Sequence, residues 1–327
     1  MPNGDHKYFN KEVINLNKKH ILLTFLISLV IIFSLNGATL ASNSDDVIIL
    51  GDANWPGIRA KNAVVKCILE NIGYNVKRMS ASDPMIRQAL TTGDIDIYLG
   101  PWMPSLKKSR KKNMDKYHFV TTNMHQGLAG MAVPEYVYEQ GVTSLADLDE
   151  HAEKFDKKFY TGPAGWIYDQ FIRKAIKNDI YGLGDWEIVT SNKAALMAQI
   201  EKSINNQEWI CYGAWKPHWM NIVYNTKYLD DPESLFSNIY SWVDTLTRTG
   251  FPEDRPQVTK FLKQFIISAE TNSTFSYEIG YNEQDPDKFA REWIKNNIYK
   301  VSRYLSLVEA KNGKPAIEVL KKNLNIN

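Results

Sequence analysis

The chain has 327 residues, of which 44% are apolar and 12% aromatic, with 39 basic and 37 acidic side chains. This length and composition suit two domains of ordinary size or one large α/β unit, and they exclude a disordered or low-complexity chain. Four of the basic and two of the acidic residues fall within residues 1–41, so the rest of the chain is neutral. Neutrality argues against nucleic acid or an anionic lipid surface as the principal partner.

The first 41 residues have the pattern of an export signal. Two lysines precede an apolar run over residues 21–35, and small residues follow up to Ala41. We predict a signal peptide over residues 1–41, cleavage, and a periplasmic protein. No cysteine lies near the cleavage site, which excludes a lipoprotein. The alternative is an uncleaved N-terminal membrane anchor, because residues 21–41 can just span a bilayer.

From residue 46 onward, strand and helix patterns alternate, as in an α/β fold with mainly parallel strands. Strands are expected over residues 47–50, 75–79, 95–99, 127–133, 159–161, 187–190 and 209–212. Helices are expected over residues 58–72, 84–90, 144–155, 166–177, 192–204, 258–267 and 286–306. The last fifteen or so residues carry no strong pattern, so we expect them to be loosely attached.

This alternation predicts two α/β lobes, with the chain crossing between them twice. Lobe 1 is discontinuous, over residues 45–130 and 218–327, and lobe 2 covers residues 131–217. Cys67 and Cys211 lie on a predicted helix and in a predicted strand, which favours two separately buried thiols, although an exported chain also allows a disulfide. The cysteine spacing fits no metal or redox site, and we predict no metal and no cofactor.

Three predicted strands end in the same way, with a glycine followed within a few residues by a tryptophan. These tryptophans are Trp55, Trp102 and Trp215, and a fourth, Trp166, stands where a Gly-Pro-Ala-Gly turn becomes a helix. Because the carboxyl ends of parallel strands line a common crevice, we expect the indole rings to gather there. The other five tryptophans are expected to pack in cores: Trp186, Trp209, Trp219, Trp242 and Trp293.

A cluster of indole faces suits one kind of ligand. Each face attracts a cation by roughly 0.5–2 kcal/mol, and a quaternary ammonium is bulky, cationic and unable to donate an N–H hydrogen bond. Asp52 either faces the crevice and complements the cation or caps the helix after Pro56. The backbone N–H groups of Ile167 and Tyr168, at a helix N-terminus, suit an anionic oxygen.

Three segments carry a family resemblance. Residues 100–105 (GPWMPS), 162–166 (GPAGW) and 213–219 (GAWKPHW) resemble the ligand motifs of the substrate-binding proteins of glycine betaine/proline betaine/choline ABC transporters. The resemblance implies a periplasmic-binding-protein fold (Venus-flytrap, type II) with the ligand in the inter-lobe cleft, and a monomer that docks on a membrane ABC permease. It implies that Trp102, Trp166 and Trp215 are cage walls, and Trp55 matches an extra wall of the choline and trimethylamine N-oxide branches.

The chain also departs from the family pattern. The choline branch has an acidic residue where this chain has Gly57 and an aromatic residue near Ala129, and the betaine branch has a histidine where this chain has Leu106. Choline is therefore less favoured, and a carboxylate must be recognised by other residues than that histidine. Glycine betaine is the expected ligand. Trimethylamine N-oxide, choline, carnitine and dimethylsulfoniopropionate remain alternatives. An enzyme acting on a quaternary amine is a further alternative, but the sequence has no nucleophile elbow, nucleotide loop or metal set, so we expect no catalytic residues.

Overall fold

The computed structural model describes residues 47–104, 106, 111, 113, 115–164, 167–234 and 240–326, and for Ile167 and Tyr168 it describes the backbone alone. The predicted signal peptide over residues 1–41 and the candidate residue Trp166 lie outside these ranges. Within them, no helix combines the length and the apolar character that crossing a bilayer needs.

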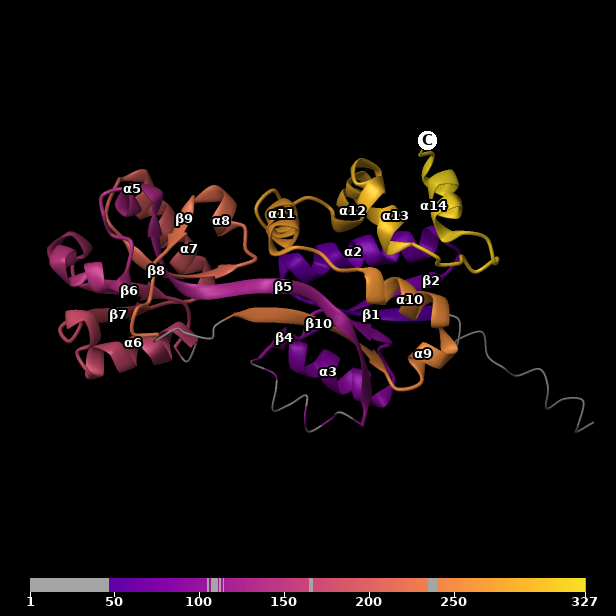
Figure 1. Ribbon diagram of the computed structural model, residues 1–327, viewed down its shortest axis with the longest axis horizontal. Coiled ribbons are helices and arrows are strands. Elements are labelled where there is room, and N and C mark those ends of the chain that lie inside the picture. The colour runs from indigo at the N-terminus through magenta and orange to yellow at the C-terminus, as the bar shows by residue number, and fades with distance from the viewer. Residues whose placement is uncertain are drawn as a thin grey trace, which may run out of the picture. The chain divides into compact units, whose positions relative to one another are not determined.

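The described strands form one mixed sheet in the order β2-β1-β3-β10-β5-β8-β6-β7, with β4 paired to β10 and β9 paired to β5 (Figure 1). β1 is parallel to β3, and β6 is parallel to β7 and β8. In contrast, β10 runs antiparallel to β3 and to β5, and β5 runs antiparallel to β8. The strands are β1 (Val47–Ala53), β2 (Asn75–Ala81), β3 (Ile97–Tyr98), β4 (Trp102–Met103), β5 (Tyr117–Pro134), β6 (Lys158–Thr161), β7 (Glu187–Thr190), β8 (Cys211–Lys216), β9 (Thr226–Tyr228) and β10 (Ser241–Arg248).

Helices connect these strands and cover the sheet. The α-helices are α2 (Pro56–Asn71), α3 (Asp83–Thr92), α5 (Glu135–Tyr138), α6 (Ile167–Lys177), α7 (Lys193–Asn205), α8 (Met220–Val223), α9 (Phe251–Asp254), α10 (Pro256–Gln264), α11 (Ala269–Gly280), α12 (Pro286–Asn296), α13 (Ile298–Tyr304) and α14 (Ala316–Leu324). The short 3₁₀ segments are η2 (Leu145–Asp147), η3 (Asp149–Phe155) and η4 (Ile180–Gly182).

The long strand β5 joins two parts of the fold. Its first half pairs with β10, and its second half pairs with β8 and β9. We call the part built on β1–β4, β10 and the first half of β5 lobe 1, and the part built on β6–β9 and the second half of β5 lobe 2. Each lobe has its own buried apolar clusters.

The junction of β1 and α2 positions the first candidate residue. Trp55 precedes the first residue of α2 and has extended dihedral angles (φ −145°, ψ 146°). Pro56 occupies the first helical position, where its missing N–H removes no helical hydrogen bond. The chain therefore turns sharply from strand to helix at Trp55.

Helix α2 is buried on almost every side. It packs between the sheet and helices α11, α12 and α14, and Figure 1 shows α12 running above it. Consecutive residues from Ala60 to Val65 are all buried, including Lys61 and Asn62. A helix with one solvent face would expose some of these positions, which the sheet covers on one side and the C-terminal helices cover on the other. The polar side chains of Lys61 and Asn62 face the sheet, where they donate to Leu99, Asn123 and Gly51.

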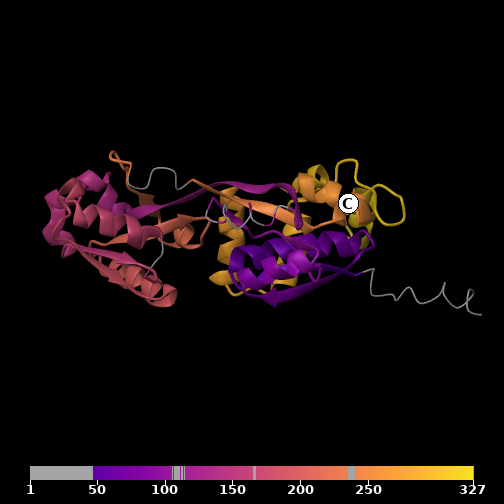
Figure 2. The ribbon, with the colours of Figure 1, turned by 90° about the horizontal axis from the view of Figure 1, so that it is seen from below.

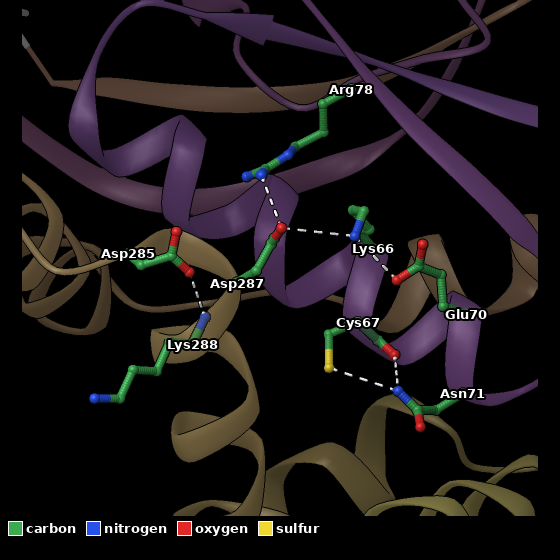
Figure 3. Close-up of polar contacts among 8 residues, drawn as sticks. All are labelled: Lys66, Cys67, Glu70, Asn71, Arg78, Asp285, Asp287 and Lys288. Carbon is green, nitrogen blue, oxygen red and sulfur yellow. Dashed lines mark hydrogen bonds and ion pairs between the residues drawn. The ribbon is translucent and has the colours of Figure 1, made fainter.

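Ion pairs connect α12 to α2 and β2 of lobe 1. Asp287 pairs with Arg78 of β2 at 3.1 Å and with Lys66 of α2 at 3.7 Å, and Lys66 also pairs with Glu70 at 3.0 Å (Figure 3). These side chains are partly exposed, so each pair contributes little stability. Their main effect is to fix where α12 sits on α2.

The C-terminal residues are packed, and the prediction that they are loosely attached is wrong. Ala316, Leu320 and Leu324 of α14 are buried in the main core of lobe 1. Their spacing of four residues puts them on one face of a short helix. A nine-residue helix gives a weak sequence signal, and tertiary packing supplies its stability.

Of two further sequence predictions, one about a helix is wrong and one about the cysteines is confirmed. The helix expected over residues 144–155 is two 3₁₀ segments, begun by a capping box between Ser144 and Asp147. The two cysteines are free and buried, Cys67 in the core of lobe 1 and Cys211 in a core of lobe 2, which confirms the prediction of two separate thiols.

The segment after Pro217 packs with lobe 2. Met220 and Tyr224 are buried in one of its clusters, Leu229 is buried in the other, and β9 pairs with the second half of β5. We therefore propose that lobe 2 extends to about residue 230, beyond the boundary at residue 217 drawn from the sequence pattern.

Candidate functional site

Trp55 and Trp102 lie together in lobe 1. Their ring centroids are 6.4 Å apart, with an angle of 52° between the ring planes. Trp102 belongs to the two-residue strand β4 and pairs with Val243 of β10. Both indoles are half-buried, so part of each ring surface is accessible. Two tilted aromatic faces at this separation form a wedge that suits a compact cation.

Close packing beside Trp55 explains one departure from the family pattern. A Cβ atom at Gly57 would lie 3.0 Å from the Trp55 ring and 2.9 Å from Oδ1 of Asn272. A side chain at this position would require the Trp55 ring and the Asn272 amide to shift. This side of the wedge is lined by an indole edge and a neutral amide.

Asp52 lies at the end of β1 and is buried, with 6% of its surface exposed. Its Oδ1 accepts a hydrogen bond of 2.8 Å from Nδ2 of Asn62. It does not cap α2, because the residue at the cap position is Trp55 and no side chain bonds to the first turn. The capping alternative is therefore wrong. Asp52 provides a carboxylate three residues before Trp55.

Lys61 is a fully buried cation behind Trp55. Its Nζ donates to the carbonyl oxygen of Leu99 at 2.7 Å and to Oδ1 of Asn123 at 2.8 Å. The same Nζ lies 5.9 Å from the centroid of the Trp55 ring. Both acceptors are neutral, and burial lowers the pKa of Lys61 to about 7. Lobe 1 thus contains a lysine that changes charge near neutral pH.

Trp215 stands in lobe 2, on β8. Its partner across the strand pair is Ala129 of β5, so the aromatic residue that the choline branch has near this position is replaced by a methyl group. Nζ of Lys193 lies 5.7 Å from the centroid of the Trp215 ring. Burial lowers the pKa of Lys193. An ammonium group therefore stands beside the lobe 2 tryptophan.

His218 stacks between two indoles. Its ring centroid lies 4.6 Å from that of Trp215 and 5.0 Å from that of Trp219, and we call these three residues the lobe 2 stack. His218 is buried, with 3% of its surface exposed. Burial, and then the charge of Lys193, hold its pKa well below the usual value, so the imidazole is neutral at pH 7.

The hydrogen bonds of His218 fix its tautomer. Nδ1 accepts the backbone N–H of Met220 at 3.2 Å, so the single proton of the neutral ring is on Nε2. Nε2 is buried and has no hydrogen-bond partner among the described residues. A buried donor without an acceptor is rare and costs about 1–3 kcal/mol. The lobe 2 stack therefore contains a buried N–H group whose hydrogen-bonding capacity is unused within the described part of the chain.

The end of α11 contacts both groups of residues. A Cβ atom at Gly280 would lie 2.6 Å from Cγ of Pro56 and 3.3 Å from Cδ1 of Trp219. Only a glycine lets α11 approach the N-terminus of α2 and the lobe 2 stack at once. The two groups of candidate residues therefore border the same helix end.

The remaining candidates are placed less completely. Ile167 and Tyr168 are the first two residues of α6, as the sequence predicts, and their side chains lie outside the described atoms, as does Trp166. His125 and Gln126 line an open hollow of about 740 Å³ together with Tyr240 and Trp242. Trp242, which we expect to be a packing residue, is partly buried and also borders this hollow.

Other tryptophans pack as expected. Trp186 and Trp293 are buried in the cores of lobe 2 and lobe 1. Trp209 packs against Phe155, with ring centroids 5.2 Å apart. Trp219 belongs to the lobe 2 stack and is only partly buried. No group of three or more His, Cys, Asp or Glu side chains within the described ranges could hold a metal ion.

Three side chains next to the candidate residues escaped the sequence analysis: Lys61, Lys193 and His218. Lysines on helices usually face water, and a single histidine usually has a structural role. The one available signal was the place of His218, three residues after Trp215 in a segment that already carried the family resemblance. The burial of Lys61 could not be read from α2 alone, because its partners Leu99 and Asn123 lie far from it in the sequence.

The chain matches known proteins in sequence. Residues 46–296 match the family described as the substrate binding domain of ABC-type glycine betaine transport systems. The chain is 34% identical over 143 residues to the glycine betaine/carnitine transport binding protein GbuC of Listeria monocytogenes, covering 43% of this chain and 46% of that protein. It thus spans less than half the length of that relative. It is 21% identical over 306 residues to the trimethylamine N-oxide-binding protein of Pelagibacter ubique, covering 84% and 96%.

The fold also matches solved structures. An ABC-transporter choline-binding protein in complex with choline superimposes with a TM-score of 0.67 and 26% identity, covering 85% of this chain and 98% of that one. The matched family and structures are transport binding proteins and not enzymes, as the sequence predicted. The predicted two-lobed α/β fold class is confirmed. The chain belongs to the family of substrate-binding domains of ABC-type glycine betaine transport systems.

Proposed function

We propose that the protein is a periplasmic solute-binding protein that captures a zwitterionic quaternary ammonium compound, glycine betaine above others, and delivers it to an ABC permease. The observation that carries the proposal is the pair of indoles at Trp55 and Trp102, with ring centroids 6.4 Å apart. Family membership supports the transport role. The ligand closes the two lobes around itself, so that binding shifts the open–closed equilibrium.

The cationic end of the ligand is held by aromatic faces. Trp55 and Trp102 form the lobe 1 wall, and Trp166 and Trp215 form the lobe 2 wall. Each face contributes roughly 0.5–2 kcal/mol to binding of a trimethylammonium group. Asp52 adds a negative charge behind the lobe 1 wall, and its burial supports this role because water screens it little.

The anionic end is held in lobe 2. The Nε2–H of His218 has no acceptor among the residues that the structure describes, and in the proposed complex a ligand carboxylate supplies one. The ammonium group of Lys193, beside Trp215, favours the same negative charge. The backbone N–H groups of Ile167 and Tyr168 at the start of α6 offer further donors.

Several solutes share a methylated cation, and the group opposite the cation distinguishes them. Choline carries a neutral hydroxyl and needs an acidic acceptor, and where the choline branch has an acidic residue this chain has Gly57, packed against Trp55 and Asn272. Trimethylamine N-oxide is the second candidate, because a single short donor such as His218 suits its oxygen, and a relative in Pelagibacter ubique carries that name. Carnitine and dimethylsulfoniopropionate carry a carboxylate and remain in the same ligand class.

The site of action follows from the leader pattern and the family. After removal of residues 1–41 the protein works as a monomer in the periplasm. It contacts nucleic acid at no step. Its macromolecular partner is the membrane permease that accepts the closed, liganded form.

A calorimetric panel tests the proposal. Purified protein is titrated with glycine betaine, proline betaine, choline, carnitine and trimethylamine N-oxide at pH 8.5. We expect glycine betaine to bind at least tenfold more tightly than choline. Equal or tighter binding of choline would contradict the zwitterion preference, and absence of binding by every compound would contradict the proposed function.

A further inference from the structure

Lys61 and Lys66 are five residues apart on α2 and have opposite surroundings. Lys66 is partly exposed and pairs with Glu70 at 3.0 Å and with Asp287 at 3.7 Å (Figure 3). Lys61 is fully buried and donates to two neutral oxygens, those of Leu99 and Asn123. A buried ammonium with neutral acceptors is destabilised relative to its neutral form, whereas a paired surface ammonium is not.

Lys61 also lies next to Trp55, which forms part of the proposed cation wall. Its Nζ lies over the Trp55 ring, 5.9 Å from the centroid. A ligand cation bound to that ring lies within about 6 Å of the same centroid, and so within roughly 12 Å of Lys61 Nζ. Two positive charges at this separation in a poorly screened interior repel each other, so they weaken each other's binding by about tenfold.

The other charged groups around Lys61 do not neutralise it directly. Asp52, at the end of β1, accepts from Asn62, and Asp244, on β10, accepts from Thr122 Oγ1 at 2.9 Å. On β3 the contact is the carbonyl oxygen of Leu99, and β5 contributes the amide of Asn123. Helix α11 contributes neutral Asn272 beside Gly57.

Asn123 extends this contact into the strand that joins the lobes. Its Nδ2 donates to the carbonyl oxygen of Asp244 at 2.7 Å and to Oγ1 of Thr245 at 3.0 Å. Lys61 therefore links α2, which begins at the Trp55 wall, to the β5–β10 strand pair. The charge of Lys61 therefore lies close both to the Trp55 ring and to the strand pair that joins the lobes.

We propose that Lys61 makes capture of a cationic ligand proton-coupled: binding of the cation at the Trp55 wall releases the proton of Lys61, so affinity rises with pH. The inference rests on the proposed function, since it requires a cationic ligand at Trp55. The direction is fixed by charge. Below the pKa of Lys61, about 7, the free site is positive and opposes the ligand, and above it the opposition disappears.

Titration calorimetry with glycine betaine from pH 5.5 to 8.5 tests the proposal. We expect the affinity to fall about tenfold on going from pH 8.5 to pH 5.5. At pH 6.5, measurements in two buffers of different protonation enthalpy should show release of about half a proton per ligand bound. His218 does not contribute in this range, because its pKa lies well below the usual value.

Variants test whether the released proton comes from Lys61. In Lys61→Met the rise of affinity with pH and the proton release should be lost. Lys193, whose Nζ lies 5.7 Å from the Trp215 ring and whose pKa burial also lowers, is tested in the same way, and Lys193→Met should keep both effects. The matched control Lys66→Met, on the same helix as Lys61, should also keep both. If Lys61→Met does not fold, Lys61→Gln keeps a donor for Leu99 and is measured in the same way.

The outcomes separate the two proposals. Binding that is independent of pH in the unmodified protein, or an unchanged pH dependence in the Lys61 variants, overturns the role of Lys61 and leaves the proposed function intact. Absence of binding by every panel compound at pH 8.5 overturns both.

Discussion

The two lobes place different polar groups near the same helix end. Lobe 1 has the half-buried indoles of Trp55 and Trp102, and the buried carboxylate of Asp52 lies at the end of β1, three residues before Trp55. Lobe 2 has the buried N–H of His218, which has no acceptor among the described residues and lies between Trp215 and Trp219, and it has the ammonium of Lys193. In the proposed site the anionic end of a zwitterion therefore lies against lobe 2, while indoles of both lobes surround its cationic end.

The difference also shows where each lobe stores unfavourable free energy. In lobe 1 it lies in Lys61, a charge buried without a counter-ion, and in lobe 2 it lies in His218, a donor buried without an acceptor. In the proposed complex, the ligand carboxylate gives the buried N–H of His218 an acceptor. The ligand cation raises the free-energy cost of the buried Lys61 charge, unless the lysine loses its proton. A zwitterion and a simple cation should thus respond differently to changes in each lobe.

The largest expected effect comes from removing the aromatic walls. Trp102→Ala or Trp215→Ala should weaken binding of glycine betaine at least tenfold and up to about a hundredfold, because each loses a cation–π face and buried apolar contact. Calorimetry measures the affinity, and circular dichroism shows that the fold is intact. Near-native affinity in both folded variants would contradict a cage shared between the lobes.

A smaller effect concerns the stability of lobe 2 in acid. Because the pKa of His218 is depressed in the folded state, the unfolded chain binds more protons, so the stability that this group supplies is full above pH 6.5 and is lost as pH falls. Between pH 7 and pH 5 we expect this group to lower the free energy of unfolding by about 2 kcal/mol. Urea unfolding of His218→Phe, which keeps the aromatic packing, should lack this loss. An identical pH dependence in both proteins would show that His218 is charged when folded.

The candidate residues of lobe 1 were predictable because the signal is local. A strand that ends in glycine and then tryptophan positions the indole at the strand end wherever the strand lies in the sheet. Trp55 and Trp102 lie together for this reason. The role of Asp52 was left open between two alternatives, and the structure removes the capping one, because Trp55 itself occupies the cap position.

The features that escaped prediction all depend on contacts between distant segments. Lys61 is buried because its side chain reaches Leu99 and Asn123, which follow it in the chain by 38 and 62 residues. The tautomer of His218 depends on the backbone of α8, and its isolation on two stacked indoles. The packing of the C-terminal helix α14 also escaped prediction, because it depends on contacts with the core of lobe 1.

The proposed division of the ligand between the lobes is tested most directly by comparing His218→Phe with the unmodified protein against two ligands. Phenylalanine keeps the stack and removes the Nε2–H donor, together with the Nδ1 acceptor of the Met220 N–H. Affinity for glycine betaine should therefore fall about tenfold, while affinity for choline, which has no carboxylate, stays the same. A loss of equal size for both ligands, or no loss for glycine betaine, would show that lobe 2 does not bind the anionic end.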